Sequence, residues 1–389
     1  MRSFLSKTIC WPNKEQELLL RACLLTGDNA LAAWQQWENV VGKRTLDLGS
    51  HRLLPLLYRN LHNHGVDESL TVNFKQEYFH TWSQNQFTFH RVAALIREFN
   101  RAGVDTMLLK GAALVILFYK DAGLRPMTDV DLLVRRHQAK RSIQLLTSLG
   151  WKSKYSSPEA FIPFEQAGEF THANNQNLDL HWRLMWEGRQ DINGDEFWIE
   201  SVTTEINGVP ARALNPADQL LHVCVHGAKW NDTPSLRWVA DAMMIIRSPE
   251  LKIDWVRLVH QAQERRLTLP MRETLAYLDH LFKASIPSEV LNCLQNTTTS
   301  RAERWFYQIR LGPNDALKTL PVIAHWIDSL RKDCEGHLPQ RLLKFAQYLR
   351  SLWSVKHTWQ IPFVLFAKPF RRIYHTLKVS LGTNGSAAT

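Results

Sequence analysis

Residues 107–134 read MLLKGAALVILFYKDAGLRPMTDVDLLV, and this stretch decides the fold of the chain. It predicts a strand, a turn at Gly111, an apolar helix, a loop and a second strand that carries Asp129 and Asp131. Residues two apart in a strand point to the same face, so the two carboxylates are expected to project side by side. They repel each other unless a cation or a proton lies between them. The stretch therefore indicates a site for Mg²⁺ and phosphate.

The rest of the chain divides by its hydrophobic patterning. Strand patterns are confined to the middle, and helical patterns lie on both sides. This distribution predicts an α+β fold, with a catalytic core between helical regions. The expected regions are N-terminal helices over 1–102, the core over 103–214, C-terminal helices over 215–333 and a basic tail over 334–389. More locally, we expect a helix over 51–64, strands over 169–173 and 178–184, and a hairpin of strands over 197–206 and 209–214.

A third carboxylate lies on the later predicted strand, LDLHWRL at 178–184. Its residues alternate in polarity, which places Asp179 and His181 on the exposed face. If this strand lies beside the one that carries Asp129 and Asp131, the three carboxylates converge. Carboxylate oxygens suit Mg²⁺, which keeps positions free for substrate phosphates. A pair of such ions would activate an attacking oxygen and stabilise a leaving pyrophosphate.

The cysteine usage and the hydropathy of the chain indicate in which cellular compartment the protein is expected. The five cysteines are scattered and include no CxxC pair. This usage argues against a disulfide framework and a zinc ribbon, and it favours a reducing environment. No apolar run reaches the roughly 18–20 residues that a membrane-spanning helix requires. We therefore expect a cytoplasmic protein.

The net charge of +10 belongs largely to the tail. No Asp or Glu occurs from 336 to 389, and this segment carries +8 of the +10. Its basic residues alternate with Trp and Phe, which suits peripheral contact with an anionic membrane through residues 336–380. RNA is a less favoured partner. The structural alternative is a helical extension that packs its aromatic side chains on the body of the protein.

Three motifs resemble one known family. They are Lys110-Gly111, LRPMTDVDLLV at 124–134 and LDLHWRL at 178–184. Together they are similar to the uncharacterised bacterial nucleotidyltransferase family of the polymerase-β-like superfamily. The resemblance covers roughly residues 10–280 and extends to three further segments, at 51–57, 222–229 and 236–241.

The resemblance implies a fold, a reaction and a set of site residues. The fold is a small mixed sheet with helices, and the reaction transfers a nucleoside monophosphate from a nucleotide triphosphate with two Mg²⁺ ions. Asp129 and Asp131 match the paired metal ligands. Asp179 matches the third carboxylate, which binds one metal and activates the acceptor hydroxyl. Gly111 matches the turn glycine. Ala112 departs from the superfamily, in which a phosphate-binding serine is frequent here, so that backbone N–H groups at the helix start would bind phosphate.

Two cationic side chains have both a functional and a structural interpretation. Lys110 and Arg125 are candidate partners of the nucleotide phosphates. For Arg125, the structural alternative is an ion pair with Asp121 or Asp129. For Lys110, a purely structural role is equally open.

The histidines of the motifs have several interpretations. His181 shares the face of Asp179 and is expected to hydrogen-bond it, to contact the nucleotide or to fill a core position. His222 and His226 lie four residues apart on a predicted helix, hence on one face. With no third ligand nearby in sequence, we interpret them as pocket-lining or helix-packing residues rather than as a metal pair. Asp241 is interpreted as the partner of one of these histidines or of an arginine.

The sequence thus predicts a Mg²⁺-dependent nucleotidyltransferase with three catalytic carboxylates. Its acceptor is left open as a small molecule, a sugar or a protein side chain, and its nucleotide preference is open too. The alternative is a catalytically weak, nucleotide-binding regulatory protein that its basic tail docks to a membrane or a partner. Ala112 favours this alternative, and the full set of carboxylates opposes it.

Overall fold

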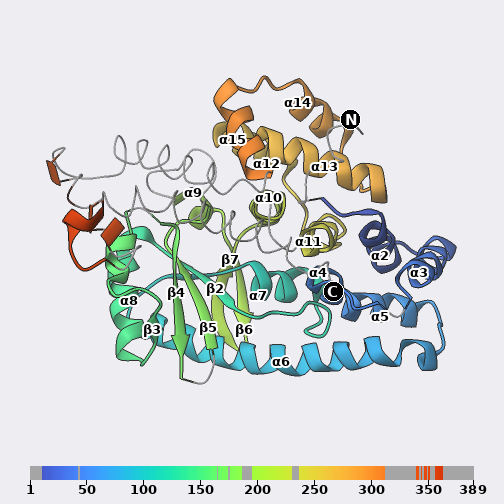
Figure 1. Cartoon of the computed structure of the whole chain (residues 1–389), viewed down its shortest axis with the longest axis horizontal. Helices are drawn as coiled ribbons and strands as arrows, with labels where there is room; N and C mark the ends of the chain where they lie inside the picture. The colour runs from blue at the N-terminus through green and yellow to red at the C-terminus, as the bar shows by residue number, and fades with distance from the viewer. Residues whose placement is uncertain are drawn as a thin grey trace, which may run out of the picture.

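A computed structural model shows how these elements are arranged (Figure 1). It describes residues 11–42, 44–163, 165–173, 176–185, 195–229, 236–311, 339–340, 343, 346–347, 349–350 and 355–361. Most of the predicted membrane-binding segment, 336–380, therefore lies outside the described residues.

One mixed sheet of seven strands forms the core of the described chain, in the order β3-β4-β5-β2-β1-β7-β6. The strands are β1 (Thr106–Leu109), β2 (Val130–Val134), β3 (Lys152–Ser153), β4 (Ala167–His172), β5 (Gln176–His181), β6 (Val202–Ile206) and β7 (Val209–Ala213). β2 is antiparallel to β1 and parallel to β5, and β1 is parallel to β7. All strands come from the middle of the chain, so the α+β prediction is confirmed.

Helices precede, interrupt and follow the sheet. The first group comprises α2 (Lys14–Leu24), α3 (Asp28–Val41), α4 (Leu48–His51), α5 (Leu54–Asn63) and α6 (Glu68–Arg101). Between the strands lie α7 (Lys110–Leu114), the π-helical η1 (Val115–Tyr119), η2 (Arg136–Gln138), α8 (Ala139–Ser148), η3 (Pro158–Phe161) and α9 (Asp195–Ile199). The last group comprises α10 (Pro216–Gly227), α11 (Arg237–Ile246), α12 (Trp255–Glu264), α13 (Thr268–Phe282), α14 (Ser288–Asn296), α15 (Arg301–Leu311) and η4 (Thr358–Gln360).

The long helix α6 supports the sheet from below in the view of Figure 1, whereas α10 to α15 lie above it. Its second half buries Phe89, Val92, Ile96 and Phe99, which recur at steps of three and four residues and so form one stripe. α6 contacts β1, β6 and β7 of the sheet. The sheet thus lies between α6 below and the C-terminal helices above (Figure 1).

One local prediction was wrong. The segment that begins at Phe197 is not a strand, because residues 195–199 form α9 and β6 begins only at Val202. Phe197 and Trp198 are both buried, and the guanidinium groups of Arg265 and Arg135 lie over their respective rings. The helix expected over 51–64 is present as α5, which begins at Leu54 with Pro55 in its first turn, where the missing N–H of proline is tolerated.

The loop that leads into β2 is fixed to α6. The side-chain amide of Asn85 is fully buried and donates to the carbonyl oxygens of Ala122 and Arg125 at 2.6 and 2.8 Å. Gly123 lies so close to α6 that an added Cβ would be 2.2 Å from the Tyr78 ring. The position of Arg125 thus depends on a helix that lies outside the sheet.

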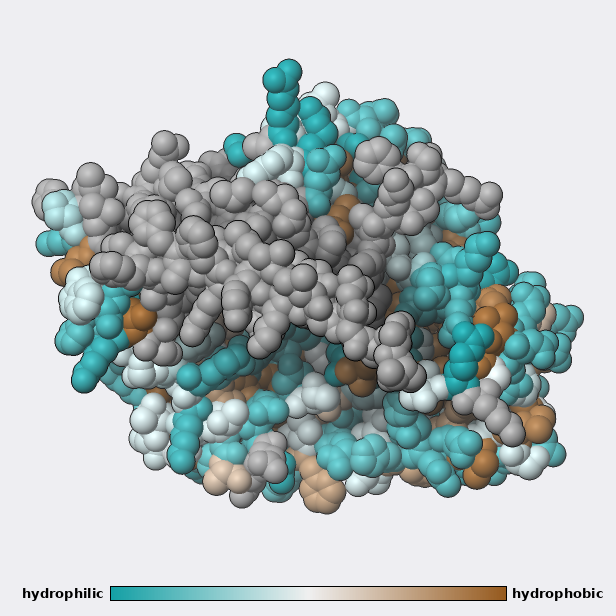
Figure 2. Space-filling view, in the orientation of Figure 1, coloured by the Kyte–Doolittle hydropathy of each residue, from teal (hydrophilic) through white to brown (hydrophobic). Residues whose placement is uncertain are grey.

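The described residues of the tail include two that pack on the body of the protein. Leu349 and Ile361 are buried and belong to the hydrophobic core, whereas Trp359 is exposed. None of the helices in the described ranges combines the length and the apolar character needed to cross a membrane. Figure 2 shows hydrophobic side chains scattered among hydrophilic ones along the lower edge, where α6 lies, a distribution that is ordinary for a protein surface.

Asn85→Ala is expected to lower the free energy of unfolding by about 1–3 kcal/mol, because it leaves buried carbonyl oxygens without a donor. Urea denaturation measures the loss. Asn73→Ala is the matched control, since Asn73 lies on the same helix and is exposed. Equal stability of the two variants would show that the loop does not depend on Asn85.

Candidate active site

The site begins where β1 ends. Lys110 adopts a φ of +42°, in the left-handed region, which costs a residue other than glycine roughly 1–2 kcal/mol. The side chain of Lys110 lies with Nζ 2.5 Å from Oδ1 of Asp131 on the neighbouring strand. Such strain is found where a surrounding structure enforces it, and it is common at functional sites.

Gly111 is required by the close approach of two other side chains. A Cβ at this position would lie 2.8 Å from Met127 Sδ and 2.9 Å from Arg125 Nη1. The guanidinium group of Arg125 therefore rests directly on the turn. The next residue, Ala112, is buried in the hydrophobic core, so it offers no group to a ligand.

β2 and β5 bring two carboxylates together. In their parallel register, Asp131 lies directly opposite Asp179. One oxygen of each carboxylate and one ring nitrogen of His181 all lie within 4.8 Å of one another. His181 Nε2 is 2.9 Å from Asp131 Oδ1. His181 therefore hydrogen-bonds Asp131 instead of the residue on its own strand.

Asp129 is placed differently from the other two carboxylates. It lies directly before β2, it is exposed, and Thr128 Oγ1 donates to it at 3.3 Å. It lines the same pocket as Asp131 but is not a member of the group formed by Asp131, Asp179 and His181. The predicted adjacency of the two strands is thus present, with Asp129 at the mouth of the pocket.

The two neighbouring carboxylates differ in their ionisation. Burial raises the pKa of Asp131, but the hydrogen bond with His181 and the positive charge of Lys110 outweigh burial and hold this pKa below its usual range. Burial and then the negative charge of Asp131 raise the pKa of Asp179 to about 6. One carboxylate is fixed as an anion, and the charge of the other is disfavoured until a cation arrives.

Arg125 forms a buried ion pair that joins the core to the C-terminal helices. Its Nε donates to Asp241 Oδ1 at 2.7 Å, and its Nη2 donates to Oδ2 at 2.9 Å. Tyr119 donates its hydroxyl to the same carboxylate at 2.8 Å. The prediction that Arg125 pairs with Asp121 or Asp129 was wrong: Arg125 pairs with Asp241, and Asp121 pairs with Arg59 of α5. The interpretation of Asp241 as the partner of an arginine is confirmed.

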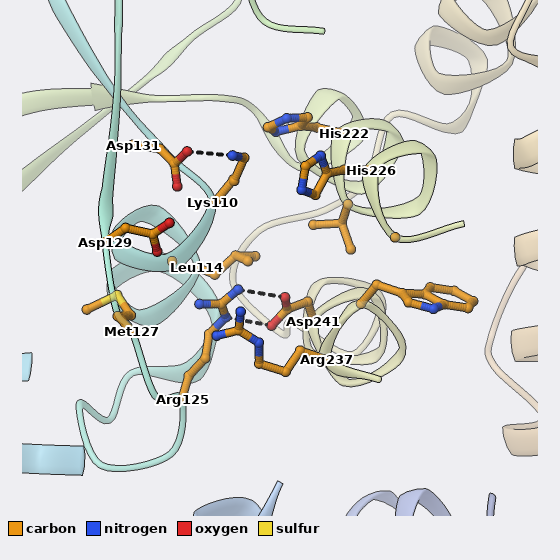
Figure 3. Close-up of a pocket in the computed structure, with 14 residues that line it drawn as sticks. Lys110, Leu114, Arg125, Met127, Asp129, Asp131, His222, His226, Arg237 and Asp241 are labelled. Carbon is orange, nitrogen blue, oxygen red and sulfur yellow. Dashed lines mark hydrogen bonds and ion pairs between the residues drawn. The ribbon is translucent and has the colours of Figure 1, made fainter. Parts of the chain in front are cut away.

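Figure 3 shows the pocket between these elements. Asp131 and Lys110 lie at one end, and Arg125, Asp241 and Arg237 lie at the other. His222 and His226 face the carboxylates from α10, with their ring centroids 6.0 Å apart, and their interpretation as pocket-lining residues is confirmed. Burial and the charge of Lys110 lower the pKa of His222 to about 3, so this imidazole is neutral at pH 7.

Arg237 is the pocket residue that sequence reasoning missed. It is the first residue of α11, and its Nη1 donates to the carbonyl oxygen of Pro126 at 2.6 Å. The signal was its spacing from Asp241, because residues four apart on a helix share a face. Both side chains consequently reach the pocket from α11.

A glycine turn and neighbouring carboxylates on two parallel strands thus lie beside a pocket lined with basic side chains, the arrangement that the motifs predicted for a nucleotidyltransferase. Sequence comparison agrees. A family model described as "Uncharacterised nucleotidyltransferase" matches residues 48–283, more than half of the chain, and the chain belongs to this family. The resemblance seen in the motifs is thus confirmed, and a nucleotide is the implied substrate.

Two solved structures are similar to part of the chain. One is the lincosamide antibiotic adenylyltransferase LnuA with lincomycin bound, at 18% identity over 40% of this chain and 93% of that chain, with a TM-score of 0.29. The other is an antigenic nucleotidyltransferase-like protein from Paracoccidioides brasiliensis, at 16% identity over 57% and 96%, with a TM-score of 0.32. No curated protein matches the chain.

Asp241→Asn is expected to destabilise the protein by about 3–5 kcal/mol, because it leaves the buried guanidinium group of Arg125 without its counter-charge. The double variant Arg125→Met/Asp241→Leu is expected to be more stable than the sum of its single variants predicts. Urea denaturation of the wild type, Arg125→Met, Asp241→Leu and the double variant measures the coupling. Glu98→Gln, which removes an exposed partner of Arg101, is the control and should change little. Additive losses would contradict a coupled pair.

Asp179→Asn is expected to raise the melting temperature of the metal-free protein at pH 7. The folded state raises the pKa of Asp179 to about 6, so ionising this group costs folding free energy above that pH. Asparagine removes the charge and keeps the shape. The advantage should shrink at pH 5, where Asp179 is largely protonated in the folded protein. Thermal unfolding at both pH values with a chelator tests this, and an equal effect at both would contradict it.

Proposed function

We propose that the protein transfers a nucleoside monophosphate from a nucleotide triphosphate to an acceptor hydroxyl, with release of pyrophosphate. The observation that carries the proposal is the register of β2 and β5, which sets Asp131 opposite Asp179 beside the Gly111 turn. Membership of a nucleotidyltransferase family supports the same reaction.

The donor set fits a divalent cation. Asp131 is buried with a neighbouring carboxylate of the same charge, and their oxygens converge with His181 within 4.8 Å. Oxygen donors that repel each other in the metal-free state are suited to Mg²⁺. Asp129, Asp131 and Asp179 would hold it, with Asp129 contributing from the mouth of the pocket. When bound, the metal, as two ions in this proposal, supplies charge stabilisation for the transferring phosphoryl group and the leaving pyrophosphate.

The side chains of the chain itself have distinct roles in this proposal. Asp179 takes the proton of the acceptor hydroxyl, because its carboxylate is the one that binds a proton readily. His181 and Lys110 hold Asp131 as an oriented anion. Arg125 and Lys110 are the cationic contacts of the phosphates. Gly111 lets the polyphosphate approach the turn, whereas His181 is buried and acts in this proposal through its hydrogen bond with Asp131.

Asp131→Asn is expected to lower nucleotide-dependent pyrophosphate release at least about 100-fold, because it removes the anion around which the site is built. A coupled pyrophosphate assay with Mg²⁺ measures it. Glu169→Gln is the matched control, since Glu169 lies opposite Asp179 on β4 but is exposed and paired with Lys154. Unchanged turnover in Asp131→Asn would refute the enzyme proposal.

The nucleotide is identified by a binding measurement that needs no acceptor. At least one of the four nucleotide triphosphates is expected to raise the melting temperature in the presence of Mg²⁺ beyond the effect of Mg²⁺ alone. The shift should be absent in Asp131→Asn. A shift that is the same with a chelator would contradict the role of the carboxylates in nucleotide binding.

A further inference from the structure

The arginine end of the pocket holds more positive charge than its carboxylate balances. Arg125 engages both oxygens of Asp241 through Nε and Nη2. Arg237 is half-buried beside this pair, and among the described residues its side chain donates one hydrogen bond, to the carbonyl oxygen of Pro126. In the described part of the chain, Arg237 has no carboxylate partner. Arg52, at the end of α4, has none either, and its charge acts on Arg237.

The guanidinium groups come from three separate regions of the chain. Arg52 follows α4, Arg125 lies in the loop before β2, and Arg237 begins α11. Burial and then the charge of Arg125 lower the pKa of Arg237 to about 10, so it remains charged at pH 7 next to a like charge. Like charges held together in a half-buried pocket favour the binding of an anion between them.

The position of this cluster relative to the carboxylates points to the class of anion. Arg125 Nη1 is 2.9 Å from the point that a Gly111 Cβ would occupy, so the cluster adjoins the glycine turn. Asp131 lies at the opposite end of the same pocket, across from Arg125 and Arg237 (Figure 3). A ligand whose reacting phosphate lies at the carboxylates would extend its remaining phosphates toward the arginines.

We infer that Arg237, together with Arg125 and the charge of Arg52, forms a binding site for the terminal phosphates of the nucleotide triphosphate. The inference deepens the proposed function and rests on it. It adds the C-terminal helices to the nucleotide site, because α11 supplies the arginine that has no carboxylate partner. Planar guanidinium groups bind phosphate through paired N–H donors, which suits them to a polyphosphate chain.

The test uses inorganic tripolyphosphate, which contains the polyphosphate without the base or sugar. Calorimetric titration of the full chain in Mg²⁺ buffer should show binding, weakened about 10- to 100-fold by Arg237→Gln. Arg237→Lys should recover part of the affinity, since it keeps the charge but not the paired donors. Arg272→Gln is the matched control, because Arg272 also donates to backbone carbonyl oxygens and lies outside the pocket. Its affinity should equal that of the wild type.

Arg52→Gln provides a second test in case the Arg237→Gln protein does not fold. The side chain of Arg52 makes no hydrogen bond in the described ranges, so its replacement should leave the melting temperature unchanged and weaken tripolyphosphate binding about two- to fivefold. Full wild-type affinity in folded Arg237→Gln, or unchanged affinity in Arg52→Gln where the former does not fold, would overturn the inference. So would a wild-type protein that does not bind tripolyphosphate.

The outcomes separate this inference from the proposed function. Turnover that depends on Asp131, together with tripolyphosphate binding that is indifferent to Arg237, refutes the arginine site and leaves the transferase. Tripolyphosphate binding that depends on Arg237, with no pyrophosphate release from any nucleotide triphosphate, refutes the transferase and leaves the anion site.

Discussion

The buried ion pair between Arg125 and Asp241 is the constraint on which the pocket depends. Removing two charges from water is costly, and the cost is offset only when the geometry is good and the remaining hydrogen-bonding positions are filled. Here the pair is bidentate, and Tyr119 occupies a further position on the carboxylate. Because the two partners belong to the core loop and to α11, the pair fixes the distance between the sheet and the C-terminal helices.

Near this ion pair, the pocket contains several conformations and charge contacts that are energetically unfavourable and that the surrounding structure must hold in place. Lys110 holds a left-handed backbone, Asp131 and Asp179 repel each other, and Arg125 and Arg237 are like charges in one pocket. Each would relax if the surrounding elements moved apart. The ion pair with Asp241 ties the loop that carries Arg125 to α11, and the amide of Asn85 ties the same loop to α6. Such local costs are expected at a site prepared for a charged ligand, since binding relieves them.

The glycine turn could be found from the sequence, because it lies between a strand and a helix. The period of two residues placed Asp129 and Asp131 on one strand face, but Asp129 precedes β2, and Asp131 instead meets Asp179 through the register of β2 and β5. The partner of Arg125 could not be predicted, because Asp241 is far along the chain and nearer acids offered equally plausible pairs. Phe197 was wrongly assigned to a strand, because the pattern of a short segment is compatible with both a strand and a helix. The contacts of Phe197 and Trp198 with Arg265 and Arg135, which are distant in sequence, could not be predicted from that pattern.

The regions predicted from patterning, with boundaries near 102 and 214, describe changes in local structure more than units of function. The pocket takes residues from two of them, the core and the C-terminal helices, and α6 of the first region holds the loop that carries Arg125. The family match over 48–283 begins at α4 and includes all of these elements. A core excised at the predicted boundaries would lose Asp241, and with it the group that positions Arg125. The C-terminal helices are therefore part of the proposed nucleotide site, because α11 supplies Asp241, one half of the ion pair that shapes the pocket.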